Sequence, residues 1–137
     1  LEWYGYDVEL LPEYSPRIAG YLADALVAIH ADSCLLEEGT TGFKVARVQN
    51  SAIPTLDDRL ARCLWTEYEA ATHLPRHEGS ITADMLHYHA LKEIAAQTPG
   101  AIIEIGFLGK DRETLVFRQD IIAQGLANAL ICFLEGS

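Results

Sequence analysis

Two chemically active side chains interrupt the most apolar stretches of the sequence. His30 follows the apolar run 25–29, and Glu104 stands inside the apolar run 101–107. Short apolar runs without polar alternation are typical of strands buried in a parallel sheet. In open α/β sheets the chemistry takes place at the carboxyl ends of such strands. We therefore expect the fold to bring His30 and Glu104 together in one site.

Both side chains suit a hydrolytic metal site, although each has a simpler interpretation. A histidine at the end of a buried strand has a fixed backbone and a ring nitrogen that can bind a metal; the alternative is a core histidine bonded to a backbone carbonyl. A carboxylate among isoleucines is unusual unless it is paired. Burial would raise the pKa of Glu104 toward the range useful for proton transfer, whereas an exposed position at a sheet edge would not.

Other candidate residues lie outside these two runs. Cys34 would need a neighbouring base and an orienting group to act as a nucleophile. His73 and His77 have the spacing of a helical pair, but the proline between them should break the helix. We expect Tyr88 or His89 to line a substrate groove, and most of the remaining histidines and glutamates to be solvated.

Length and composition indicate a single domain over residues 1–137. A chain of 137 residues, half of them apolar, can bury one core. No apolar run is long enough to cross a membrane. The net charge of -10 argues against nucleic-acid binding and against an anionic membrane surface, because no basic stripe is available for phosphates.

The three cysteines do not form a C-x-x-C pair, and their odd number leaves at least one unpaired. Cys63 and Cys132 lie among apolar neighbours, and we interpret both as small buried hydrophobic residues. The sequence starts at Leu1, and its one methionine is Met85. We therefore expect a chain that was processed or cut from a longer polypeptide.

Hydrophobic periodicity and turn residues predict alternating strands and helices. We expect strands at 6–11, 25–30, 42–48 and 101–107, and helices at 15–24, 55–74, 82–96, 110–117 and 119–134. An irregular first half of 82–96 is the alternative for that segment. Thr55 and Asp58 resemble a capping box, and Asp111 should cap the helix that follows it. The first strand, first helix and second strand should form a right-handed crossover. The pattern predicts an α/β fold, with a mostly parallel central sheet flanked by helices on both faces, in three layers.

Four segments carry a family resemblance. Residues 27–33 (VAIHADS) are similar to the "SIHAN" or "SIHAD" strand end of zinc-dependent N-acetylmuramoyl-L-alanine amidases of type 3, and residues 101–108 (AIIEIGFL) resemble their "LVEIGFLSN" strand. Residues 5–8 (GYDV) resemble the "GYDVxLT" strand of the same family. Residues 111–115, followed by a terminal amphipathic helix, match the family's ending. The resemblance covers nearly the whole chain in the right order.

The resemblance implies a peptidoglycan hydrolase with zinc (Zn2+) as its cofactor. These enzymes cleave the amide between the lactyl group of N-acetylmuramic acid and the first L-alanine of the stem peptide, and two histidines and a glutamate hold the metal. His30 matches the last of the zinc ligands. Glu104 matches the catalytic glutamate, which would carry a proton from a zinc-activated water to the leaving amine. The implied substrate is peptidoglycan, and the implied location is extracytoplasmic: cell wall, periplasm or secreted.

The chain departs from the family pattern at its start. Neither the "DPGHGG" motif nor the glutamate on the following helix has a counterpart, so the resemblance implies a catalytic domain without its N-terminal strand and helix. We expect weak zinc binding, little hydrolysis by the chain alone, and self-association through an exposed sheet surface. Two alternatives stay open: a non-catalytic peptidoglycan-binding or regulatory relative that has lost the metal site, and another zinc hydrolase such as a peptidase.

Overall fold

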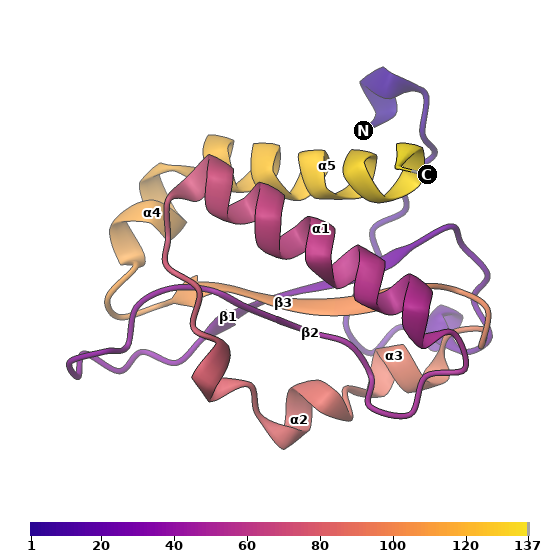
Figure 1. Cartoon of the computed structure of the whole chain (residues 1–137), viewed down its shortest axis with the longest axis horizontal. Helices are drawn as coiled ribbons and strands as arrows, with labels where there is room; N and C mark the ends of the chain where they lie inside the picture. The colour runs from indigo at the N-terminus through magenta and orange to yellow at the C-terminus, as the bar shows by residue number, and fades with distance from the viewer. Residues whose placement is uncertain (137) are drawn as a thin grey trace.

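A small sheet lies between two layers of helices in the computed structural model, which describes residues 1–136 (Figure 1). The strands are β1 (Leu26–Asp32), β2 (Lys44–Ala46) and β3 (Gly100–Phe107), in the spatial order β1-β3-β2. β1 runs parallel to β3, and β2 pairs with the other side of β3 in the antiparallel direction. β3 is therefore the central strand.

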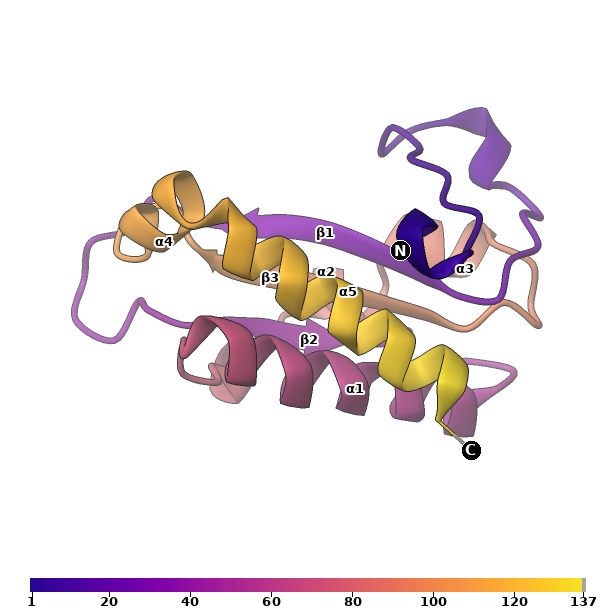
Figure 2. The same cartoon turned by 90° about the horizontal axis from the view of Figure 1, so that it is seen from above.

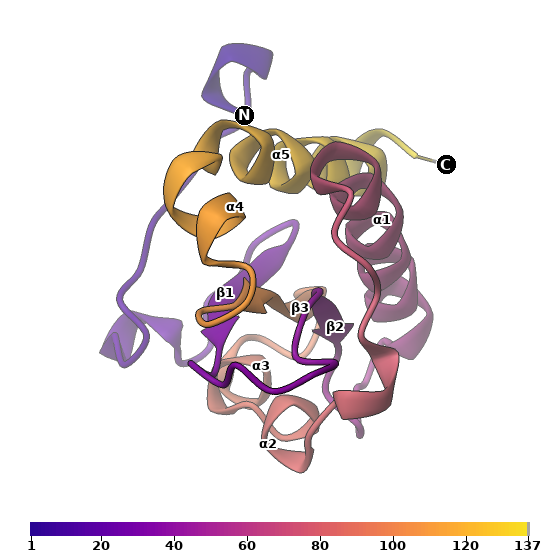
Figure 3. The ribbon, with the colours of Figure 1, turned by 90° about the vertical axis from the view of Figure 1, so that its left-hand side faces the viewer.

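The two faces of the sheet have different helical covers. The long helices α1 (Pro54–Thr72) and α5 (Gln119–Glu135) pack together over one face, and the short helices α2 (Ala83–Leu86) and α3 (His89–Glu93) lie on the other (Figure 3). α4 (Arg112–Phe117) links β3 to α5, which crosses above the sheet (Figure 2). Three 3-10 turns complete the described elements: Glu2–Tyr4, Pro16–Ile18 and Glu78–Ser80. The expected three-layer α/β fold is confirmed.

The main core lies between the sheet and the α1/α5 layer. The predicted face of α1 is buried, because Leu60, Leu64 and Tyr68 recur at helical spacing and are fully covered. α5 contributes a matching stripe that includes Ala129 and Phe133. The long helices predicted at 55–74 and 119–134 are thus confirmed within two residues at each end. No helix in residues 1–136 is long and apolar enough to span a membrane.

The beginning of the chain differs most from the prediction. Residues 6–11 form no strand, and the helix expected at 15–24 is reduced to the turn Pro16–Ile18, after which Gly20 adopts a positive φ of 69°. The side chains of residues 7–10 are exposed, and their backbone pairs with no strand in the described part of the chain. The predicted crossover is therefore wrong, and the parallel partner of β1 is β3. β1 is a half-buried edge strand, with Ile29 53% exposed.

Several local predictions fail because side chains find partners distant in sequence. The helix expected at 82–96 is interrupted at His87 and Tyr88, which separate α2 from α3. Thr55 and Asp58 form no capping box: α1 starts after Ile53 without a side-chain cap, and Asp58 pairs with Arg47. Asp111 likewise does not cap α4.

Asp111 instead joins two loops at one end of the sheet. Its buried carboxylate accepts hydrogen bonds from the backbone N–H of Gly42 at 2.9 Å and of Phe107 at 2.8 Å. The hydroxyl of Thr41 donates to the other oxygen. The segment that leads into β2 is therefore fixed to the end of β3.

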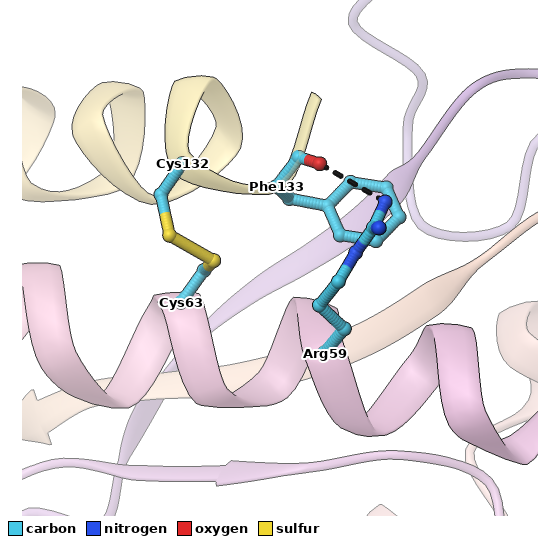
Figure 4. Close-up of a disulfide and its surroundings, with 4 residues drawn as sticks. All are labelled: Arg59, Cys63, Cys132 and Phe133. Carbon is cyan, nitrogen blue, oxygen red and sulfur yellow. Dashed lines mark hydrogen bonds between the residues drawn. A yellow bond between two sulfur atoms is a disulfide. The ribbon is translucent and has the colours of Figure 1, made fainter. Parts of the chain in front are cut away.

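The interpretation of Cys63 and Cys132 as unpaired hydrophobic residues is wrong. They form a disulfide between α1 and α5, with 69 residues of sequence separation and a Cα–Cα distance of 5.9 Å (Figure 4). Beside it, Arg59 lies 4.6 Å above the ring of Phe133 and donates to its carbonyl at 3.1 Å. The helix packing creates this proximity, and cysteine spacing alone does not reveal it.

Candidate active site

A polar row crosses the sheet on the face covered by α2 and α3. In the strand register Glu104 is the partner of His30 on β1 and of Lys44 on β2. Laterally paired residues project from the same face. Two residues away, the row formed by Ala28, Ile102 and Ala46 packs under α2 and α3.

The face thus changes from apolar to polar toward the carboxyl ends of β1 and β3. The expected proximity of His30 and Glu104 is confirmed by their direct pairing on adjacent strands. Their proposed roles as metal ligand and catalytic glutamate stay predictions. The sheet fixes both backbones, so the two side chains start from rigid positions.

Glu104 has the environment expected of a proton-transfer group. Its side chain is half-buried, and its Oε2 atom is buried without a hydrogen-bond partner in residues 1–136. Burial raises the pKa of Glu104, the negative charge of Asp32 raises it further, and His30 and Lys44 oppose the shift. The net pKa lies above the ordinary glutamate value, which favours reversible protonation closer to neutral pH.

A buried ion pair stands next to Glu104. Lys44 is only 5% exposed; its Nζ lies 2.6 Å from Oδ2 of Asp32 and donates to the carbonyl and hydroxyl of Ser80 at 2.9 and 3.1 Å. Burial works against ionisation of Asp32, but Lys44 and the N–H of Ser33 hold its pKa below the ordinary value. Asp32 is therefore the ionised carboxylate beside Glu104, and Lys44 is its counter-ion.

His30 is held by an aromatic residue from the junction of α2 and α3. The hydroxyl of Tyr88 lies 2.9 Å from Nε2 of His30, and the two rings meet edge-on with centroids 4.9 Å apart. The same hydroxyl donates to Oε1 of Glu13 at 3.3 Å. Burial, and then the charge of Glu13, raises the pKa of Tyr88, which therefore stays a neutral hydroxyl. A metal ion on Nε2 would have to displace this contact.

The other candidates lie around the polar row or away from it. His77 joins its border, because one ring nitrogen contacts Ser80 and the other lies 2.9 Å from the carbonyl oxygen of Gly39. α1 ends at Thr72, close to the break that the proline after Leu74 predicts, and His73 follows it in a left-handed conformation and is exposed. Cys34 is an exposed free thiol.

Sequence reasoning missed the pairing of Lys44 with Asp32. Lys44 lies in a strand of alternating polarity, and that pattern by itself indicates a solvated polar face. Asp32 lies two residues beyond His30, past an irregularity in the strand register. Burial of a lysine depends on a counter-ion from another strand, and this is a tertiary property.

The described residues lack the ligands of a complete zinc site. A catalytic zinc takes three protein ligands and keeps one open position. Residues 1–136 contain no group of three His, Cys, Asp or Glu side chains that could hold a metal ion. The described residues therefore do not form a zinc site by themselves, and His30 is at most one ligand of a larger set.

Comparison with known proteins gives a clear result at the level of the fold. No protein-family model and no curated protein matches the chain. Solved structures do: an N-acetylmuramoyl-L-alanine amidase from Clostridium difficile 630 superposes with a TM-score of 0.65 at 20% identity, over 84% of this chain and 60% of that one. For the amidase AmiC2 of Nostoc punctiforme the TM-score is 0.65 at 19% identity, over 82% and 59%.

A further match is the catalytic domain of the amidase CwlV from Bacillus (Paenibacillus) polymyxa var. colistinus, with a TM-score of 0.59 at 21% identity, over 84% of this chain and 60% of that one. The chain thus spans about 60% of the length of the solved structures that it matches. It has the fold of N-acetylmuramoyl-L-alanine amidase catalytic domains.

Proposed function

We propose that the chain carries peptidoglycan amidase chemistry: hydrolysis of the amide between the lactyl group of N-acetylmuramic acid and the first L-alanine of the stem peptide. The observation that carries this proposal is the pairing of His30 with Glu104 on adjacent strands of an amidase-like fold. A histidine and a carboxylate of raised pKa at the carboxyl ends of parallel strands are suited to amide hydrolysis.

Glu104 has the acid–base role in this proposal. As a carboxylate it accepts the proton of the attacking water, and as a carboxylic acid it donates that proton to the leaving amine of L-alanine. The Lys44–Asp32 pair keeps the neighbouring charge fixed while Glu104 changes its protonation state. The absence of a hydrogen-bond partner for Oε2 of Glu104 in residues 1–136 supports this role.

We also propose Zn2+ as the cofactor of the complete site, with His30 as the ligand that this chain offers. Zinc in such a site supplies Lewis acidity and lowers the pKa of bound water. The other ligands would have to come from outside residues 1–136, in agreement with the absence of a three-ligand group there.

An extracytoplasmic location fits the covalent structure. Disulfides persist in oxidising compartments and are rare in the cytosol. The Cys63–Cys132 bond therefore supports a place in the cell wall, the periplasm or the medium, where a peptidoglycan substrate is available.

The second candidate function is a non-catalytic peptidoglycan-binding relative. Two observations favour it: residues 1–136 offer no three-ligand group, and Tyr88 already occupies Nε2 of His30. The presence of a half-buried glutamate with an unpartnered oxygen disfavours it, because such a group lowers stability and a purely binding protein has no use for it.

The decisive experiment is digestion of purified peptidoglycan by the zinc-supplemented polypeptide that joins this chain to the segment with the other zinc ligands, with mass spectrometry of the soluble products. Amidase chemistry releases stem peptides with a free L-alanine amine, whereas a peptidase releases fragments cut within the stem. Glu104→Gln should abolish release, and Glu113→Gln, an exposed change of the same chemistry, should not.

Zinc content after dialysis, with His30→Ala as the control, completes the test. Co-sedimentation with peptidoglycan but no product and no zinc would favour the binding relative. If the polypeptide with all its zinc ligands releases no product and the chain does not sediment with peptidoglycan, both proposals are wrong.

A further inference from the structure

A turn at residues 12–15 contacts the start of α3 through two successive side chains, those of Glu13 and Tyr14. The N–H of Ser15 donates to the carbonyl of Pro12 at 2.9 Å and closes the turn. Glu13 accepts the hydrogen bond from Tyr88. The ring of Tyr14 stacks on the ring of His89, with centroids 5.0 Å apart and planes only 13° from parallel.

The stacked pair is connected to the candidate active site through ring contacts. The ring centroid of His89 lies 4.7 Å from that of Tyr88, which in turn contacts His30. The side chain of Glu93 lies 3.3 Å from Nδ1 of His89 and fixes the imidazole from the other end of α3. Tyr14 is therefore the outermost ring of an aromatic row that ends at the polar row of the sheet.

Tyr14 is held in place although it is not buried. Its residue surface is 79% exposed, while the closed turn and the stack on His89 restrict its ring. A rigid aromatic surface in water is typical of a binding contact, because little side-chain entropy is lost when a ligand covers it. Trp3 and Leu10 are more exposed still but lie outside this row.

We propose that the Tyr14–His89 stack is a platform for a sugar ring of the glycan strand, next to the amide that the candidate site would cleave. The inference rests on the proposed function for its ligand class. The C–H bonds on one face of a pyranose carry partial positive charge and suit the negative π-face of a tyrosine. The carboxylates of Glu13 and Glu93 flank the stack and accept hydrogen bonds from sugar hydroxyls.

Net charge supports a sugar platform over an electrostatic contact. The chain carries a charge of -10, so it gains little attraction to an acidic polymer or to a nucleic-acid base attached to phosphate. Stacking on a neutral ring does not depend on charge. The platform would thus hold the carbohydrate part of the substrate, while the polar row would face the peptide amide.

The test is an NMR titration of the chain with chitotetraose, a soluble tetramer of β-1,4-linked N-acetylglucosamine. We expect weak binding in the millimolar range, with shift changes centred on residues 12–15 and on α3. Tyr14→Ala should weaken it about five-fold, the size of one aromatic contact. Tyr14→Phe, which keeps the ring, should bind like the unchanged chain. Tyr4→Ala, at another exposed tyrosine that is 62% exposed, should have no effect.

The outcomes separate the platform from the proposed amidase activity. Equal affinity of the unchanged chain and Tyr14→Ala would overturn the platform, as would absence of any binding by the unchanged chain. Tyr14-dependent binding, without amidase product from the polypeptide that carries all the zinc ligands, would uphold the platform and reject the catalytic proposal. If Tyr14→Ala has the same midpoint temperature of thermal unfolding as the unchanged chain, the substitution acts on binding and not on folding.

Discussion

Removal of the Cys63–Cys132 bond should cost a large part of the stability of this fold. The bond closes a loop with a sequence separation of 69 residues. The chain-entropy model gives about 4 kcal/mol at 25 °C for a loop of this length, because the open unfolded chain has more conformations. A domain of this size has a free energy of unfolding of roughly 5–15 kcal/mol, so the loss is substantial.

The perturbation is Cys63→Ser with Cys132→Ser, both in a Cys34→Ser background that prevents exchange with the exposed thiol. Urea unfolding followed by circular dichroism should give a free energy of unfolding lower by about 2–4 kcal/mol than in Cys34→Ser alone. Reductant should produce a similar loss in Cys34→Ser and no change in the triple variant.

Two results would refute this reasoning. A difference in unfolding free energy below about 1 kcal/mol would show that the loop is already constrained in the unfolded state. Thiol titration of the unchanged chain in urea without reductant should find one reactive thiol, that of Cys34. A count of three would show that the disulfide does not form, and the argument for an oxidising compartment would fall with it.

Three further predictions concern the sheet face. Burial raises the pKa of Glu104, so Glu104 in the folded chain keeps its proton at pH values where Glu104 in the unfolded chain has lost it. The free energy of unfolding therefore falls as pH rises above about 4.5. Glu104→Gln should unfold at a higher urea concentration than the unchanged chain at pH 7 but not at pH 3. Asp111→Ala leaves the backbone N–H groups of Gly42 and Phe107 without their acceptor, and should lower the unfolding free energy by about 2 kcal/mol in the same assay. Tyr88→Phe should shift the ring nitrogen resonances of His30 and cost about 1 kcal/mol, whereas unchanged resonances would rule out the hydrogen bond to Nε2.

The sequence predicted the parts of the fold that depend on long periodic patterns. α1 and α5 each bury a stripe at helical spacing, and these stripes stay apolar whatever their partners are. β3 was predicted because its run is bounded by Pro99 and Gly100 at one end. The proximity of His30 to Glu104 followed from the rule on parallel strand ends, since both runs stop at the same edge of the sheet.

The failures have a common physical cause. Residues 6–11 alternate like a strand, but a strand needs a neighbour to accept its backbone hydrogen bonds, and none is available in the described chain. The carboxylate of Asp111 could have capped the helix that follows it, but it accepts a hydrogen bond from the distant backbone N–H of Gly42 instead. Cys63 found Cys132 only because two helices distant in sequence pack together. Local composition does not show which residues distant in the sequence will contact one another in the folded chain.

The candidate site depends on whether Lys44 pairs with Asp32 or with Glu104. Two carboxylates share one buried cation, and register alone would give that cation to Glu104, its direct neighbour on β3. The ion pair goes to Asp32 instead. The pKa of Asp32 is therefore lowered while that of Glu104 is raised, so the pKa values of two acidic groups on one sheet face move in opposite directions. Carboxylates whose pKa values are separated in this way are typical of acid–base catalysis. If Lys44 paired with Glu104, the glutamate would be held ionised and could not return a proton to a leaving amine.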